Sequence, residues 1–96
     1  KVDEASVPIN RAVLSACELL GLDPFYVANE GKCIVVVDPR DAERVLGAMR
    51  KNPRGNGACV IGEVIEDNPG RVLVTTMVGG TRILSMLTGE QLPRIC

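Results

Sequence analysis

Apolar residues early in the chain recur with the spacing of one helix face. They fall at i, i+4, i+7, i+8 and i+11, namely Ile9, Val13, Ala16, Cys17 and Leu20. We predict a helix over residues 9–20 that ends at Gly21, because a helix leaves readily through a left-handed residue without a Cβ. Before it, residues 2–7 are predicted as a short strand or an irregular lead-in. After it, residues 22–28 hold a turn at Asp23-Pro24 and then an extended piece or a single helical turn.

A continuous apolar run, Cys33-Ile34-Val35-Val36-Val37, follows the polar turn Asn29-Glu30-Gly31. Such a run predicts a strand buried at the centre of a sheet. Asp38-Pro39 then opens a second helix, because an aspartate accepts hydrogen bonds from free amides and proline suits the first helical position. This helix ends at Asn52-Pro53, its basic residues Arg50 and Lys51 are structural charges at its negative end, and its predicted buried stripe is Ala42, Val45, Leu46 and Met49.

The rest of the pattern is typical of strands and turns. A strand is predicted over residues 58–66, and Asp67-Asn68-Pro69-Gly70 is a hairpin signal that leads to a return strand over residues 71–77. Gly79-Gly80 is interpreted as a turn, and residues 82–87 as one more short strand. Two helices and about four strands predict an α+β fold, in which the helices cover one face of a mixed, largely antiparallel sheet.

Composition narrows the function without identifying it. The formal net charge is −1 and the isoelectric point is near 5.4, which excludes a basic footprint for nucleic acid or an anionic membrane. No apolar run reaches the roughly 18 residues of a membrane span, and no signal peptide is visible. We therefore expect a cytoplasmic protein with no nucleic-acid partner and no membrane partner.

The cysteines do not form a metal motif. Cys17, Cys33, Cys59 and Cys96 are far apart in sequence, with no C-x-x-C pair, and the chain has no histidine. The first three are interpreted as small buried hydrophobic residues. Cys96 differs because it is the last residue of a polar, proline-containing tail, and a thiolate is a strong nucleophile near neutral pH. Eight extended residues can carry that sulfur through roughly 25 Å.

Glu30 is the second candidate, because a short turn before a strand holds a carboxylate in place. Considered alone, it is more simply a solvated turn residue, since most surface glutamates have no chemical role. A cysteine at the end of a chain is likewise more often a thiol without function. The residue pattern alone leaves both assignments open.

Two blocks of sequence resemble one known family. The ending Thr88-Gly89-Glu90-Gln91-Leu92-Pro93-Arg94-Ile95-Cys96, preceded by Gly79-Gly80-Thr81-Arg82, is similar to the carboxy terminus of the hydrogenase maturation proteins of the HypE family. Ala16-Cys17-Glu18-Leu19-Leu20-Gly21-Leu22-Asp23-Pro24 and the segment from Tyr26 to Lys32 resemble the same family. The resemblance covers almost all of the chain and implies a layered α/β fold related to the carboxy-terminal domain of the aminoimidazole ribonucleotide synthetase superfamily.

The resemblance implies a carbamoyl dehydratase of [NiFe]-hydrogenase maturation. In it, Cys96 receives a carbamoyl group, which ATP-dependent dehydration converts to a thiocyanate, the source of the cyanide ligands of the active-site iron. Glu30 is the implied catalytic base, with Asn29 and Gly31 as substrate-binding residues. Pro93 stiffens the tail, and Arg94 pairs with a phosphate or carboxylate.

The same resemblance implies the cofactors and partners. ATP and Mg are expected to bind mainly to an amino-terminal domain, which also supplies a catalytic lysine and through which a homodimer forms. The implied partners are the carbamoyltransferase HypF and the iron-scaffold complex HypC–HypD. The chain begins at Lys1 rather than methionine, as expected for a second domain, with residues 1–88 forming the domain and residues 89–96 a flexible tail. We expect the domain alone to be catalytically inactive.

Two other functions are alternatives. One is a small-molecule-binding regulatory α+β domain, for which removing the segment from Leu92 to Cys96 would leave function intact. The other is a redox-sensing thiol domain, which needs a resolving cysteine within reach of Cys96.

Overall fold

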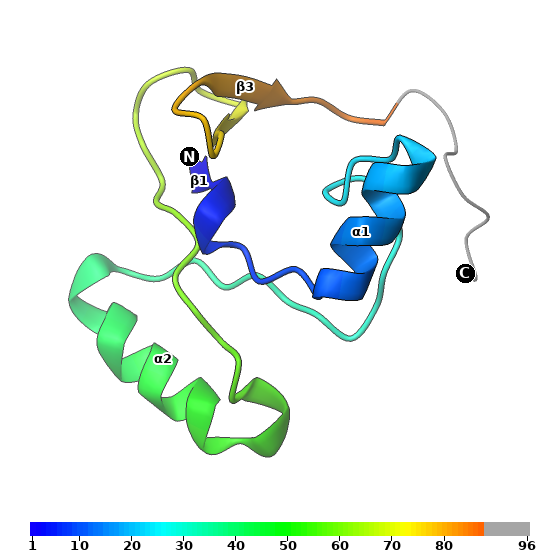
Figure 1. The fold of residues 1–96 in the computed structure, drawn as a ribbon. Coiled ribbons are helices and arrows are strands. Elements are labelled where there is room, and N and C mark those ends of the chain that lie inside the picture. The colour runs from blue at the N-terminus through cyan, green and yellow to red at the C-terminus, as the bar shows by residue number, and fades with distance from the viewer. Residues whose placement is uncertain (88–96) are drawn as a thin grey trace. The chain divides into compact units, whose positions relative to one another are not determined.

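The computed structural model describes residues 1–87, in which two α-helices, three strands and three 3₁₀ turns follow one another (Figure 1). The described chain divides into two compact units, one made of residues 1–8 and 34–85 and the other of residues 9–33 and 86–87. The elements, in order, are β1 (Val2–Asp3), η1 (Glu4–Ser6), α1 (Arg11–Leu20), η2 (Pro39–Asp41), α2 (Ala42–Lys51), η3 (Pro53–Gly55), β2 (Val72–Thr75) and β3 (Thr81–Leu84).

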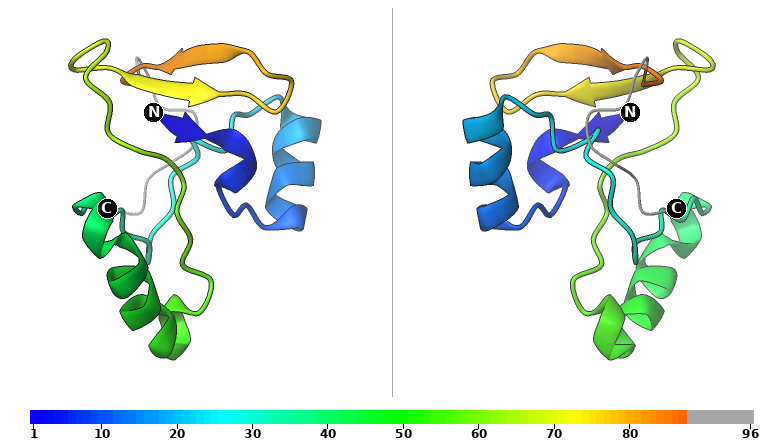
Figure 2. Two further views of the ribbon diagram at one scale, coloured as in Figure 1. Left: turned by 90° about the vertical axis from the view of Figure 1, so that its left-hand side faces the viewer. Right: turned by 90° about the vertical axis from the view of Figure 1, so that its right-hand side faces the viewer.

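The first unit contains a three-stranded mixed sheet in the order β1-β2-β3. β1 runs parallel to β2, with Val2 opposite Val74, and β2 runs antiparallel to β3, with Val72 opposite Leu84. Figure 2 shows β2 in yellow and β3 in orange as adjacent arrows. Val74 on the middle strand is fully buried, so the core of this unit lies at the centre of its sheet. Helices and a mixed sheet confirm the predicted α+β class.

The hairpin that joins β2 to β3 is built at Gly79-Gly80, as the glycine pair predicted. The Thr76 amide donates to the Gly80 carbonyl at 2.8 Å, and the Gly79 amide donates to the Thr76 carbonyl at 2.9 Å. Gly79 has φ +87°, a conformation that favours a residue without a Cβ. The turn predicted around Asn68 also forms, with the Arg71 amide donating to the Asn68 carbonyl at 3.2 Å, but it joins no pair of strands in the described chain.

Helix α1 begins two residues after the predicted start. Asn10 is its N-cap, because the Asn10 side chain accepts a hydrogen bond from the Ala12 amide at 2.9 Å. The helix ends at Gly21 with φ +66°, the left-handed exit that the sequence predicts. Cys17 is the buried residue of this helix, with 4% of its surface exposed.

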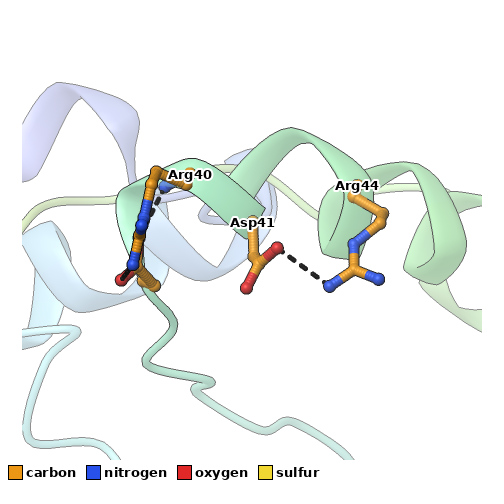
Figure 3. Close-up of polar contacts among 4 residues, drawn as sticks. Arg40, Asp41 and Arg44 are labelled. Carbon is orange, nitrogen blue, oxygen red and sulfur yellow. Dashed lines mark hydrogen bonds and ion pairs between the residues drawn. The ribbon is translucent and has the colours of Figure 1, made fainter.

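Helix α2 is preceded by a single 3₁₀ turn, η2, where the sequence predicted a continuous helix. The Asp38 side chain caps this turn by accepting from the Arg40 amide at 2.9 Å. Asp38 also forms an ion pair with Arg40, and Asp41 forms one with Arg44 at 2.8 Å (Figure 3). The predicted buried stripe of α2 is only half-buried, at Ala42, Val45, Leu46 and Met49.

Two predicted strands are wrong in the structure. Residues 33–37 form no strand, and residues 58–66 form only an isolated antiparallel bridge, between Gly62 and Val2. Ile34 and Val64 are 80% and 78% exposed, whereas Ile61 and Ile65 are half-buried. An apolar run becomes a buried strand only where another strand pairs with its backbone, and residues 33–37 have no such partner within residues 1–87.

Candidate functional site

The described candidate site is the turn from Asn29 to Lys32, which follows α1 in the second unit. Three local hydrogen bonds shape the chain between α1 and this turn. The Leu22 amide donates to the Cys17 carbonyl at 2.8 Å and closes the end of α1. The Asp23 side chain then accepts from the Phe25 amide at 3.0 Å, and the Asp23 carbonyl accepts from the Tyr26 amide at 2.9 Å. The 22–28 segment is therefore a turn, fixed mainly by Asp23.

The side-chain amide of Asn29 holds this turn through one hydrogen bond from its nitrogen and one to its oxygen. Its Nδ2 donates to the Val27 carbonyl at 3.0 Å, and its Oδ1 accepts from Lys32 Nζ at 2.9 Å. The second contact spans Glu30 and Gly31, the two residues between Asn29 and Lys32. We call the contacts of Asn29 with Val27 and Lys32 the Asn29 clamp.

Glu30 and Gly31 lie inside the Asn29 clamp. Gly31 has φ +73°, a backbone conformation that side chains with a Cβ rarely adopt, so the sharp turn after Glu30 requires glycine. Glu30 is exposed to solvent. A carboxylate on a fastened turn, accessible from outside, is suited to take a proton from a group brought to it by another part of the protein.

The structure does not show this carboxylate together with the predicted nucleophile. Pro93, Arg94 and Cys96 lie outside the described residues, as does the whole tail predicted over residues 89–96. Asn29, Glu30 and Gly31 are brought together by their position in one turn. The hydrogen bond from Lys32 to Asn29 is not predicted in the sequence analysis. The three-residue spacing of the two residues is the only feature of the sequence that indicates it.

The other cysteines correct a prediction. Cys17 is buried as expected, whereas Cys33 and Cys59 are exposed. Cys59 Sγ donates to the Ser6 carbonyl at 3.4 Å. In the part of the chain that the structure describes, no three His, Cys, Asp or Glu side chains are grouped to hold a metal ion, and no helix is long and apolar enough to cross a membrane.

Comparison with known proteins identifies the family. The model of the AIR synthase related protein family, C-terminal domain, matches residues 1–75. The chain belongs to this family. The predicted relation of the fold to AIR synthases is thereby confirmed for this AIR synthase related domain.

Curated relatives of the domain are carbamoyl dehydratases named HypE. The protein of Cupriavidus necator is 54% identical over 95 residues, and that of Rhodobacter capsulatus is 48% identical over 95 residues. Each comparison covers 99% of this chain but only 27% and 28% of the respective relative. The chain thus spans little more than a quarter of the length of these proteins.

Solved structures agree with these relatives. A crystal structure of the hydrogenase maturation protein HypE is 46% identical, with a TM-score of 0.88 over 99% of this chain and 32% of that one. HypE in complex with ATP is 46% identical, with a TM-score of 0.84 over 99% and 30%. A HypE–HypF complex is 38% identical, with a TM-score of 0.79 over 88% and 27%. The resemblance to HypE that the sequence motifs indicate is confirmed.

Proposed function

We propose that this chain is the carboxy-terminal domain of a HypE-type carbamoyl dehydratase and that Cys96 is the residue that carries the carbamoyl group. The observation that carries the proposal is similarity over nearly the whole chain, at 48% and 54% identity, to proteins named carbamoyl dehydratase. The alternative, a regulatory ligand-binding domain, does not explain why this similarity extends over the carboxy-terminal residues as well.

In the proposed reaction, the Cys96 thiolate attacks the carbamoyl carbon of a carbamoyl donor. An S–C bond forms, the bond between that carbon and the donor's leaving group breaks, and its electron pair goes to the leaving group. The carbamoyl oxygen then attacks the terminal phosphate of ATP, and ADP leaves. The nitrogen loses its two protons while the C–O bond breaks, with the electron pair going to phosphate. The products are a thiocyanate on Cys96, ADP and phosphate. Phosphorylation is needed because it turns a poor oxygen leaving group into a good one.

Glu30 is proposed as the base that removes a proton from the nitrogen. Its exposure supports this role, because the thiocarbamate must be brought to it on a separate segment. The Asn29 clamp supports it too, since a base held in one position loses less entropy in the transition state. Asn29 and Gly31, predicted as substrate-binding, are proposed instead to set the backbone on either side of Glu30.

The remaining groups are proposed to come from outside this chain. ATP, with Mg, would bind mainly to a preceding domain that supplies a lysine and forms the homodimer. A solved HypE–ATP complex supports a nucleotide requirement in similar proteins, and a solved HypE–HypF complex supports a carbamoyltransferase partner. HypC–HypD is the proposed acceptor of the cyanide. Residues 1–88 would form the domain and residues 89–96 the arm that visits the base and the partners. The chain alone would be inactive, and we propose a cytoplasmic location for the whole protein.

The test uses this chain joined behind the ATP-binding domain of a HypE relative, with HypF, carbamoyl phosphate and ATP. The peptide containing Cys96 is followed by mass spectrometry. We expect a carbamoyl adduct that loses one water only when ATP is present. An active HypF that leaves Cys96 unmodified would disprove the proposal.

The role of Glu30 is tested by Glu30→Gln, with Glu43→Gln as the matched control because Glu43 is an exposed carboxylate on α2. We expect Glu30→Gln to leave carbamoylation unchanged and to slow dehydration by about 100-fold or more, the usual contribution of a general base. Glu43→Gln should match the parent. Arg94→Ala should slow dehydration, and unchanged turnover would exclude Arg94.

A further inference from the structure

Lys32 closes the turn that carries Glu30, yet the proposed reaction gives Lys32 no task. Its Nζ donates to Asn29 Oδ1 at 2.9 Å, and this bond spans the backbone of Glu30 and Gly31. Asn29 Nδ2 donates in turn to the Val27 carbonyl at 3.0 Å. The ammonium of Lys32 is therefore the last member of a chain of contacts that encloses the candidate base.

Lys32 determines which way the side-chain amide of Asn29 points. The oxygen of this amide can only accept a hydrogen bond, and its nitrogen can only donate. An ammonium is only a donor and the Val27 carbonyl is only an acceptor, so one orientation of the amide makes both bonds. The opposite orientation would place donor against donor and acceptor against acceptor. Without the ammonium, the bond between two neutral groups is what remains of the Asn29 clamp.

The bond between Lys32 and Asn29 spans the most flexible joint of the turn. Gly31 follows Glu30 directly, and glycine has more conformational freedom to lose than any other residue. A Cβ built at Gly31 meets no atom of the described chain within 4 Å, so packing within this part of the chain does not restrict that joint. The side-chain bond from Lys32 to Asn29 links the residues on either side of it.

We propose that Lys32 is a positioning residue for the dehydration step and acts on Glu30 through the amide of Asn29. The inference rests on the proposed function, in which Glu30 is the base. Without the ammonium, the turn samples more conformations, and a smaller fraction of them places the carboxylate where it takes a proton from the thiocarbamate nitrogen. Lys32 itself donates to Asn29 and to no group of the substrate.

A cation is required at this position. A hydrogen bond from an ionised donor is roughly twice as strong as one between neutral groups. Arginine keeps both the charge and the donors, whereas methionine keeps the length of the side chain and neither of these. Lys32→Arg should therefore retain the clamp, and Lys32→Met should release it.

The test uses this chain joined behind the ATP-binding domain of a HypE relative, with Cys96 carbamoylated in advance by HypF. ATP starts a single turnover, and mass spectrometry follows the loss of water from the peptide that contains Cys96. Lys51→Met is the matched control for Lys32→Met, because Lys51 is an exposed lysine at the end of α2. Circular dichroism verifies that each variant keeps the fold of the parent.

We expect Lys32→Met to dehydrate the adduct about fivefold more slowly than the parent, as the loss of one exposed hydrogen bond implies. Carbamoylation by HypF and the ATP concentration that gives half the maximal rate should not change. Lys32→Arg should stay within about twofold of the parent, and Lys51→Met should match it. A parent-like rate for Lys32→Met, or no rescue by Lys32→Arg, would overturn the proposal.

Two combined variants separate positioning from other roles. Lys32→Met should slow dehydration by less than about twofold when it is added to Asn29→Ala, because the residue through which Lys32 acts is then absent. It should have an equally small effect when it is added to Glu30→Gln. A further fivefold loss in the first case would show that Lys32 acts on the substrate directly. The same loss in the second case would show a purely structural role, and either result would overturn the proposal.

The same measurements distinguish this inference from the proposed function. If Glu30→Gln dehydrates at the rate of the parent, Glu30 is not the base, and the inference fails together with that assignment. If Glu30→Gln is slow and Lys32→Met is not, the role of Glu30 stands and the positioning role of Lys32 alone is overturned.

Discussion

We expect the substitution Gly62→Ala, which adds a single methyl group, to destabilise the sheet. The backbone of Gly62 lies against the amino-terminal strand, and a Cβ at this position would overlap the Lys1 carbonyl oxygen and lie 2.9 Å from Val2 Cα. Both neighbours are backbone atoms, which cannot rotate away as a side chain does. Gly62→Ala must therefore separate the two segments.

The magnitude follows from the bonds that this separation breaks. The Asp3 amide donates to the Ile61 carbonyl and the Glu63 amide donates to the Lys1 carbonyl, each at 2.9 Å. At about 1 kcal/mol for each bond, their loss costs about 2 kcal/mol. Partial exposure of Val74, which lies opposite Val2 on the parallel side, adds about 1 kcal/mol. Gly62→Ala should lower the free energy of unfolding by about 2 to 3 kcal/mol.

Thermal unfolding followed by circular dichroism measures this loss. In a domain of this size, about 1 kcal/mol changes Tm by about 4 to 8 °C, so we expect a decrease of roughly 8 to 24 °C. Gly57→Ala is the matched control, because a Cβ at Gly57 meets nothing within 4 Å and its φ is not positive. Faster hydrogen exchange at Asp3 and Glu63 should accompany the loss in Gly62→Ala. Equal Tm values for the two variants would refute the argument.

Three further changes have local consequences. Gly47→Ala, in the interior of α2 with open space around it, should stabilise the chain by about 1 kcal/mol in urea unfolding; no gain would contradict the packing of α2. Asn10→Ala removes the acceptor of the Ala12 amide at the start of α1 and should cost about 1 kcal/mol, measurable as lost helicity and a lower urea midpoint. Hydrogen bonds from Arg40 lower the pKa of Asp38 below its usual 3.8. The stability that these bonds contribute is fully present above pH 3.8 and is lost as the pH falls through the lowered pKa of the folded state. Asp38→Asn should therefore unfold with a weaker dependence on pH between about pH 5 and about pH 2, and an identical acid profile would contradict the assignment.

The helices were predictable because their determinants are local. Helix α1 forms and ends at Gly21 as predicted, although Val13 and Leu20 of its predicted apolar face are 45% and 70% exposed. The two-residue error at its start arises because Asn10 takes the N-cap position, which periodicity alone does not reveal. The Asp38-Pro39 signal likewise marked the right place, although the backbone there makes a 3₁₀ turn before α2 begins.

The strands were harder because pairing depends on distant residues. The sequence favours neither a strand nor an irregular lead-in over residues 2–7, yet Val2–Asp3 pairs with β2 some seventy residues later. Conversely, the most strand-like run of the sequence, residues 33–37, has no partner among the described residues. Apolar composition indicates a preference for burial, whereas the identity of the covering strand comes from tertiary contacts.

The candidate site shows how much a motif leaves undecided. Asn-Glu-Gly indicated three residues, but it did not assign their separate tasks. The Asn29 amide is engaged at both ends, by Val27 and Lys32, and these two bonds hold the turn on either side of Glu30. Gly31 has no side chain that could contact a substrate, and its positive φ explains why a glycine occupies this position. The proposed chemistry at this turn therefore rests on the exposed carboxylate of Glu30, with Asn29 and Gly31 proposed to set the backbone on either side of it.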